Sequence, residues 1–140
     1  MAFSWSLLVD RIPTRDNLAL RHILAPDASS LCVLCGRWPE TSNHLFLHCE
    51  VSSLIWRGIL NWLEINFITP HNLFVHFECW NSEVNSKRLK KGFWYIWHAT
   101  IWLIRKERNA RIFKNQSKNV EELLDEIKVV GYLYVGFTFA

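Results

Sequence analysis

Five cysteine and histidine residues lie within an eighteen-residue stretch of this chain. Cys32 and Cys35 are separated by two residues, and His44, His48 and Cys49 follow after eight more. Two thiolates at this spacing can bend over one metal ion, and the glycine directly after them tolerates a tight backbone. Structural zinc takes four nitrogen or sulfur ligands in a tetrahedron, so the stretch predicts a zinc site.

The spacing leaves the fourth ligand open. His44 and His48 are four apart, as in two-Cys two-His fingers, but those fingers have about twelve residues between the pairs. With Cys49 instead, the set is Cys32, Cys35, His44 and Cys49, and no reactive thiol remains beside the ion. We favour this set and keep His48 as the reserve ligand. One zinc ion with four protein ligands has no position for water, so we expect it to be structural.

Helices are expected to surround and follow this block. Thr14 is a predicted N-cap of a short helix that ends before Pro26. Ser52 or Ser53 can begin the next helix, and residues 72–80 form a short amphipathic piece. A last helix is expected after Ser117 or Asn119, with four acidic residues in its first turns. Residues 131–140 alternate enough for a short strand or a frayed end.

Residues 85–114 form the longest predicted helix. Phe93, Trp97, Ile101 and Ile104 recur at spacings of four, four and three, so they share one face. Aromatic residues cover the other faces, so the middle should be buried nearly all round. Gly92 costs a helix about 1 kcal/mol relative to alanine and is a candidate break. The expected fold is mainly α, with a small zinc-centred helical domain (1–84) and a helical extension (85–140) packed with it as one unit.

Charge is unevenly distributed along the chain. Residues 1–84 carry a net charge of −3, residues 85–118 carry +9, and residues 119–140 carry −3. The basic block suits nucleic-acid phosphates as partners, although a solvated helix face is the alternative. The exposed aromatic candidates for base stacking or another outside contact are Trp38 and Trp80. The candidate phosphate-binding residues are Lys87, Arg88, Lys90, Lys91, Arg105, Lys106, Arg108, Arg111 and Lys114.

Composition and local sequence exclude several classes. The chain is 50% hydrophobic and 21% charged, which is ordinary for a globular protein and excludes a disordered chain. Residues 1–10 lack the basic start of a secretory signal. The longest strongly apolar stretch, residues 93–104, spans about 18 Å as a helix, well short of a bilayer core. We expect an intracellular protein, nuclear or cytoplasmic, that is neither secreted nor inserted in a membrane.

Several motifs occur in order along residues 1–118. They are Phe3-Ser4-Trp5, Arg11-Ile12-Pro13-Thr14-Arg15-Asp16-Asn17-Leu18, Cys32-x2-Cys35-Gly36, Glu40-Thr41, His44-Leu45-Phe46, Cys49 and Trp56, followed by Ile101-Trp102, Arg105, Glu107-Arg108-Asn109 and Ile112-Phe113. This pattern resembles the zinc-binding domain that lies C-terminal to the polymerase in reverse transcriptases of plant non-LTR (LINE-type) retrotransposons. The family's ligand pattern falls on Cys32, Cys35, His44 and Cys49. The resemblance implies a role in reverse transcription or template binding.

The catalytic parts of a whole retroelement are not visible in the sequence. A polymerase needs paired carboxylates for two metal ions, and no two aspartates here are adjacent. We therefore expect a non-catalytic fragment. One hypothesis is a zinc-stabilised module that binds RNA or DNA, single-stranded or hybrid. The other is a structural module whose aromatic helix 93–104 docks on a polymerase or RNase H domain.

Overall fold

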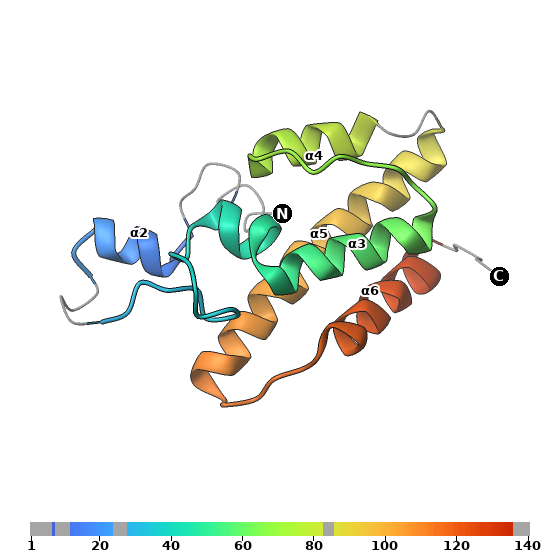
Figure 1. Ribbon diagram of the computed structural model, residues 1–140. Helices are drawn as coiled ribbons and strands as arrows, with labels where there is room; N and C mark the ends of the chain where they lie inside the picture. The colour runs from blue at the N-terminus through green and yellow to red at the C-terminus, as the bar shows by residue number, and fades with distance from the viewer. Residues whose placement is uncertain (1–6, 8–11, 24–27, 83–85, 136–140) are drawn as a thin grey trace.

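The computed structural model describes Leu7 and residues 12–23, 28–82 and 86–135 of the chain. Its helical elements are α2 (Arg15–Leu20), the π-helical turn η1 (His44–His48), α3 (Glu50–Leu63), α4 (Leu73–Ser82), α5 (Lys87–Phe113) and α6 (Val120–Val135). The long helix α5 packs against α4, α6 and η1, and α3 packs against α6 and η1 (Figure 1). Within the described ranges there is no strand, and only Leu31 and Pro39 form an isolated bridge. The expected mainly α fold is confirmed.

Local side chains start the helices. Thr14 caps α2, because its hydroxyl accepts a hydrogen bond from the Asn17 backbone N–H at 3.1 Å. At the start of α6, the Asn119 side chain accepts from the Glu122 N–H at 2.8 Å, and the Glu122 carboxylate accepts from the Asn119 N–H. This reciprocal pair is a capping box. The predicted starts of both helices are therefore confirmed.

Three expectations about helix limits were wrong. The helix expected from Ser52 or Ser53 begins earlier, at Glu50. Gly92 does not break α5, because the packing of α5 on its neighbours outweighs a local cost of about 1 kcal/mol. Residues 131–135 continue α6 instead of forming a strand, and this places Tyr132 against Trp62 with ring centroids 5.9 Å apart. Residues 136–140 lie outside the described part.

Tryptophans form the centre of the core. Trp56, Trp80 and Trp97 are all buried, and each indole N–H has an acceptor: Phe46 O at 2.7 Å, Phe93 O at 2.8 Å and His76 Nδ1 at 2.9 Å, respectively. Such pairing is what lets a tryptophan be buried without penalty. The expected outside contact of Trp80 is therefore wrong, since its side chain is inside.

The predicted buried face of α5 is confirmed, but the helix is not buried all round. Phe93, Trp97, Ile101 and Ile104 all lie in the core. Trp102, in contrast, is 52% exposed, because α5 has neighbours on only part of its circumference. Among the described residues, no helix combines the length and apolar character needed to cross a membrane.

His76 should make folding stability depend on pH. Burial lowers the pKa of His76 from 6.5 to about 4, with a smaller contribution from His48. The unfolded chain therefore takes up a proton near pH 6.5 that the folded chain takes up only near pH 4. Stability should fall as the pH drops through this window, by up to about 3 kcal/mol from this residue.

The variant His76→Asn tests this dependence, because its amide oxygen can still accept from Trp97 and does not titrate. Urea unfolding between pH 5 and pH 7.5 should show a shallower loss of stability in the variant than in the parent. His22→Asn is the matched control, since His22 is exposed and its φ of 56° suits asparagine. Equal pH slopes in the parent and His76→Asn would contradict the prediction.

Candidate metal centre

The structure brings four candidate ligands together. The ligand atoms of Cys32, Cys35, His44 and Cys49 all lie within 4.8 Å of one another. Cys35 Sγ is 3.3 Å from His44 Nε2, and Cys32 Sγ is 3.9 Å from Cys49 Sγ. Zinc bonds of about 2.3 Å to sulfur and about 2.0 Å to nitrogen give tetrahedral edges of about 3.5–3.8 Å. Three thiols and one imidazole at these separations fit one structural zinc ion.

The first two thiols are held by a tight loop. The Gly36 N–H donates to Cys32 O at 2.8 Å, and Gly36 has a φ of +68°, a conformation that favours glycine. The Cys32 N–H donates to Trp38 O at 2.7 Å and joins the two ends of the loop. This geometry turns both sulfurs toward the same point, as the C-x2-C spacing predicts.

The wide helical turn η1 brings His44 and Cys49 to the same side. The Cys49 N–H donates to His44 O at 2.6 Å, an i→i+5 bond that defines a π turn. Thr41 Oγ1 accepts from the His44 N–H at 3.1 Å and fixes the start of this turn. Cys49 is then the N-cap residue of α3, so the candidate site is joined directly to a core helix.

His48 lies outside the cluster. Its Nε2 is hydrogen-bonded to His71 O at 2.9 Å, and its side chain is exposed. Since that nitrogen must donate a proton to the carbonyl, it cannot ligate a metal in this arrangement. Of the two candidate sets, the structure assembles the one with Cys49.

The thiols differ in acidity. The hydrogen bond with the Cys49 sulfur lowers the pKa of Cys32 to about 5, against the opposing effect of burial. The same hydrogen bond and burial raise the pKa of Cys49 above its usual range. Zinc binds thiolates, so metal binding at this pair should release a proton to the solvent.

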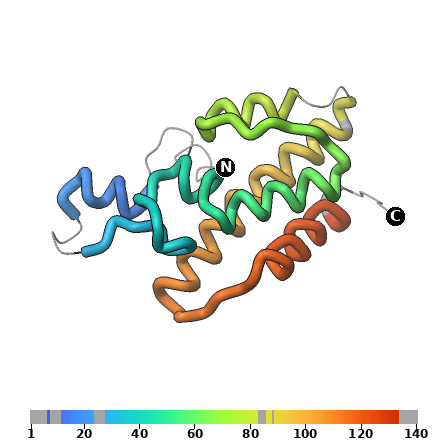
Figure 2. Tube along the Cα trace, in the orientation of Figure 1, coloured from blue at the N-terminus to red at the C-terminus, as the bar shows by residue number. Residues whose placement is uncertain are grey.

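Glu40 joins this loop to the long helix and was not identified as functional in the sequence. Its fully buried carboxylate accepts from the backbone N–H groups of Arg15 and Val33, each at 3.0 Å. The Arg108 guanidinium donates to the same carboxylate from Nη2 at 2.7 Å and from Nε at 3.4 Å. Figure 2 shows this N-terminal segment beside the C-terminal half of α5. Its only signal in the sequence was its place in the Glu40-Thr41 motif.

This contact corrects two of the expected phosphate-binding residues. Arg108 is buried on Glu40. Arg111 donates to the Glu107 carboxylate at 2.8 Å and to Leu34 O at 3.3 Å. Both guanidinium groups are therefore used within the chain, where they hold α5 to the cysteine loop.

The other basic residues of α5 lie toward its two ends. Lys87, Lys90 and Lys91 are exposed near the start, and Lys106 and Lys114 are exposed near the end. Lys91 and Arg105 are separated by about 21 Å of helix. Arg105 is half-buried, and the Arg88 side chain lies outside the described part. The exposed lysines of the basic block therefore form two separate groups, one at each end of α5.

Trp38 is the exposed aromatic residue of the cysteine loop. Its side chain is 64% exposed, as expected, and it lines a shallow surface hollow with Arg37 and Arg57. The Trp38 ring is therefore accessible to a partner.

Comparison with known proteins addresses the N-terminal region. Residues 1–56 match a family model described as zinc-binding in reverse transcriptase, and all four clustered residues lie in this span. No curated protein and no solved structure matches the chain. Phe3, Ser4, Trp5 and Arg11 of the motif pattern lie outside the described residues, and the plant and LINE-type origin stays a prediction. The resemblance seen in the sequence is therefore confirmed for residues 1–56, which are similar to the family described as zinc-binding in reverse transcriptase.

Proposed function

We propose that this chain is a non-catalytic, zinc-dependent nucleic-acid-binding module of a reverse-transcription machinery. Cys32, Cys35, His44 and Cys49 hold the ion in this proposal. The observation that carries it is their convergence, three thiols and one imidazole within 4.8 Å, in a region of the reverse-transcriptase zinc-binding family. The four cysteines of the chain are free, as zinc binding in a reducing intracellular compartment requires.

Zinc has a structural role in this proposal. The ion joins the loop at Cys32 to Cys49, the N-cap residue of α3, and Glu40 joins the same loop to α5. Four protein ligands leave no open position at which zinc could activate water. The two buried carboxylates of this region, Glu40 and Glu107, are bound to arginines, which agrees with a non-catalytic role.

Exposed lysines support nucleic acid as the partner. The described ion pairs use Arg108, Arg111 and Lys118. Five exposed lysines of α5 and its C-terminal cap have no such carboxylate partner within the described residues, and they are Lys87, Lys90, Lys91, Lys106 and Lys114. Uncompensated positive charge of this kind attracts phosphates and releases counterions when it binds them.

Salt dependence tests this proposal. Binding of single-stranded RNA and DNA oligonucleotides should weaken as salt rises, with a slope of log affinity against log salt of about −0.7 per phosphate contact. The double variant Lys106→Gln/Lys114→Gln should flatten that slope by about 1.4. Lys128→Gln on α6 is the matched control and should leave the slope unchanged. No binding by the parent protein at low salt would overturn the proposal.

A protein-docking role is the second candidate, and one observation favours it. Leu20 and Ile23 are 72% and 64% exposed at the end of α2. The apolar helix 93–104, on which docking was expected, is instead largely covered by the chain itself. Self-association in size-exclusion chromatography that is lost in Leu20→Ser/Ile23→Ser would support this role, and a monomer with the parent sequence would count against it.

A further inference from the structure

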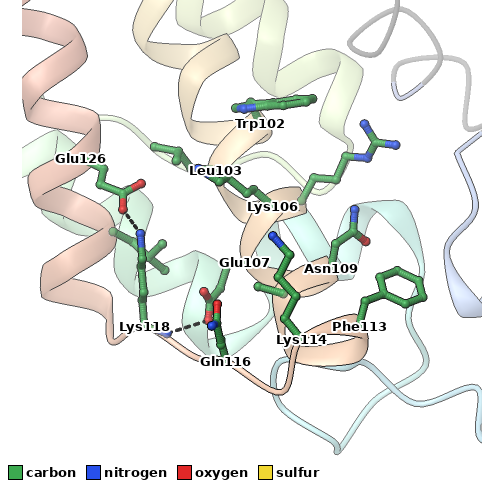
Figure 3. A pocket seen from close by; sticks show the side chains of 13 residues that line it. Trp102, Leu103, Lys106, Glu107, Asn109, Phe113, Lys114, Gln116, Lys118 and Glu126 are labelled. Atoms are coloured by element: carbon green, nitrogen blue, oxygen red, sulfur yellow. Dashed lines mark hydrogen bonds and ion pairs between the residues drawn. The ribbon is translucent and has the colours of Figure 1, made fainter.

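The C-terminal half of α5 exposes two aromatic side chains on one face. Trp102 is 52% exposed and Phe113 is 75% exposed. Trp102, Arg105, Lys106, Asn109 and Phe113 are separated by three, one, three and four residues, so they follow one another along the same side of the helix. Figure 3 shows Trp102, Lys106, Asn109 and Phe113 in this order, with Asn109 and Phe113 turned away from α6.

Phe113 stands between two shallow hollows. The first, of about 270 Å³, also includes Trp102 and Lys106, and the second, of about 250 Å³, extends to Ile12 and Phe46. Both volumes are below the roughly 300–1,000 Å³ of typical small-molecule pockets. The surface therefore suits a flat group laid against an aromatic ring better than an enclosed cofactor.

Basic groups dominate this surface. Besides the Lys118–Glu126 pair, the first hollow includes Arg105, Lys106 and Lys114 against one acidic residue, Glu107. Glu107 is already neutralised by Arg111. The second hollow includes no acid, and of its two arginines Arg108 is paired with Glu40 while Arg105 is half-buried beside Trp102. The charge thus complements a polyanion.

Arg105 links the aromatic and basic features. Its guanidinium carbon lies 5.7 Å from the centroid of the Trp102 ring, a cation–π distance. The pair places a positive charge directly beside a half-exposed aromatic face. Aromatic rings with adjacent arginines are the features by which proteins bind single strands without sequence preference.

We propose that this face, defined by Trp102, Arg105, Lys106, Asn109 and Phe113, binds single-stranded nucleic acid by stacking unpaired bases on Trp102 and Phe113. This inference rests on the proposed function and specifies its site and substrate class. The two rings are separated by eleven residues, or about 16 Å of helix. A strand with the duplex rise of about 3.4 Å per nucleotide spans this distance with about five nucleotides. Duplexes should bind more weakly, because their bases are already stacked on each other.

Fluorescence anisotropy with a labelled 12-mer of uridylate RNA tests the proposal. Trp102→Leu and Phe113→Leu keep the surface apolar but remove the stacking rings. Each should weaken binding by roughly 5- to 150-fold, the equivalent of about 1–3 kcal/mol per stacked base. Phe113→Tyr keeps an aromatic ring at this position, so it should bind the RNA with the affinity of the parent. Phe74→Leu is the matched control, because Phe74 is an exposed aromatic residue on α4 outside both hollows.

The outcomes separate this proposal from the proposed function. If the parent binds and both leucine variants bind equally well, the stacking face is wrong while nucleic-acid binding stands. Equal affinity for a 12-base-pair blunt duplex would also overturn single-strand stacking. If the parent binds no RNA at low salt, both proposals fail, and loss of self-association in the leucine variants would assign the face to a protein contact.

Discussion

Replacing Cys49 with serine is expected to abolish zinc binding and, with it, cooperative folding of the N-terminal half. Cys49 supplies one of the three clustered sulfurs and is also the N-cap residue of α3. Its loss therefore removes a ligand at the point where the site joins a core helix. Zinc binding at structural sites is worth about 10–16 kcal/mol at neutral pH, as much as the whole stability of a typical domain. Cys32→Ser should have the same effect.

His48→Ala should retain one zinc per chain and unfold cooperatively. His48 lies outside the cluster and is hydrogen-bonded to the His71 carbonyl. Its removal should therefore cost only the small stabilisation from one exposed hydrogen bond. Cys79→Ser is the matched thiol control, because Cys79 is a free cysteine on α4 outside the cluster.

Metal content by elemental analysis and thermal unfolding with and without a chelator measure both effects. The parent should contain one zinc ion and lose its cooperative transition when chelated. Zinc retained in Cys49→Ser but lost in His48→Ala would show that histidine is the fourth ligand. A parent protein that folds fully without metal would contradict the structural role of the ion.

Replacing Glu40 with alanine is the change expected to have the next largest effect. The substitution leaves the Arg108 guanidinium buried without its carboxylate, which typically costs about 3–5 kcal/mol. It also removes the acceptor for the backbone N–H groups of Arg15 and Val33, adding about 1–3 kcal/mol for each group that water cannot reach. Val33 lies inside the C-x2-C loop, so zinc affinity should fall as well.

A double-mutant cycle separates the pair from the backbone contacts. Arg108→Met should cost less than Glu40→Ala, because the backbone N–H donors keep their acceptor. The double variant Glu40→Ala/Arg108→Met should be less destabilised than the sum of the two single variants, because no unpaired charge remains. Urea unfolding in the presence of zinc is the measurement.

The exposed pair between Lys118 and Glu126 is the control for this cycle. Exposed ion pairs contribute little, so Lys118→Met should leave stability nearly unchanged. A Glu40→Ala variant as stable as that control would show that the buried pair does not hold the cysteine loop to α5.

Short-range patterns were enough to predict the metal cluster and most helix positions. The four clustered residues lie within eighteen positions of each other, so the spacing of the cysteines and the turn before α3 determine most of their geometry. The caps at Thr14 and Asn119 depend on contacts three residues away. Spacing alone could not decide between His48 and Cys49, because the π turn that brings Cys49 round has no distinct sequence pattern.

Which basic and aromatic side chains face solvent was decided only by the tertiary structure. Arg108 and Lys106 are both cations in the same basic block, but Arg108 meets a carboxylate 68 positions earlier in the chain, whereas Lys106 stays exposed. Trp80 and Trp102 likewise exchange their expected roles, since Trp80 packs against Trp56 of α3 and Phe93 of α5, whereas Trp102 is half exposed. The sequence by itself thus determined the metal-binding chemistry, because it depends on neighbours along the chain. The surface left for a partner depends on long-range packing, which residue spacing does not encode.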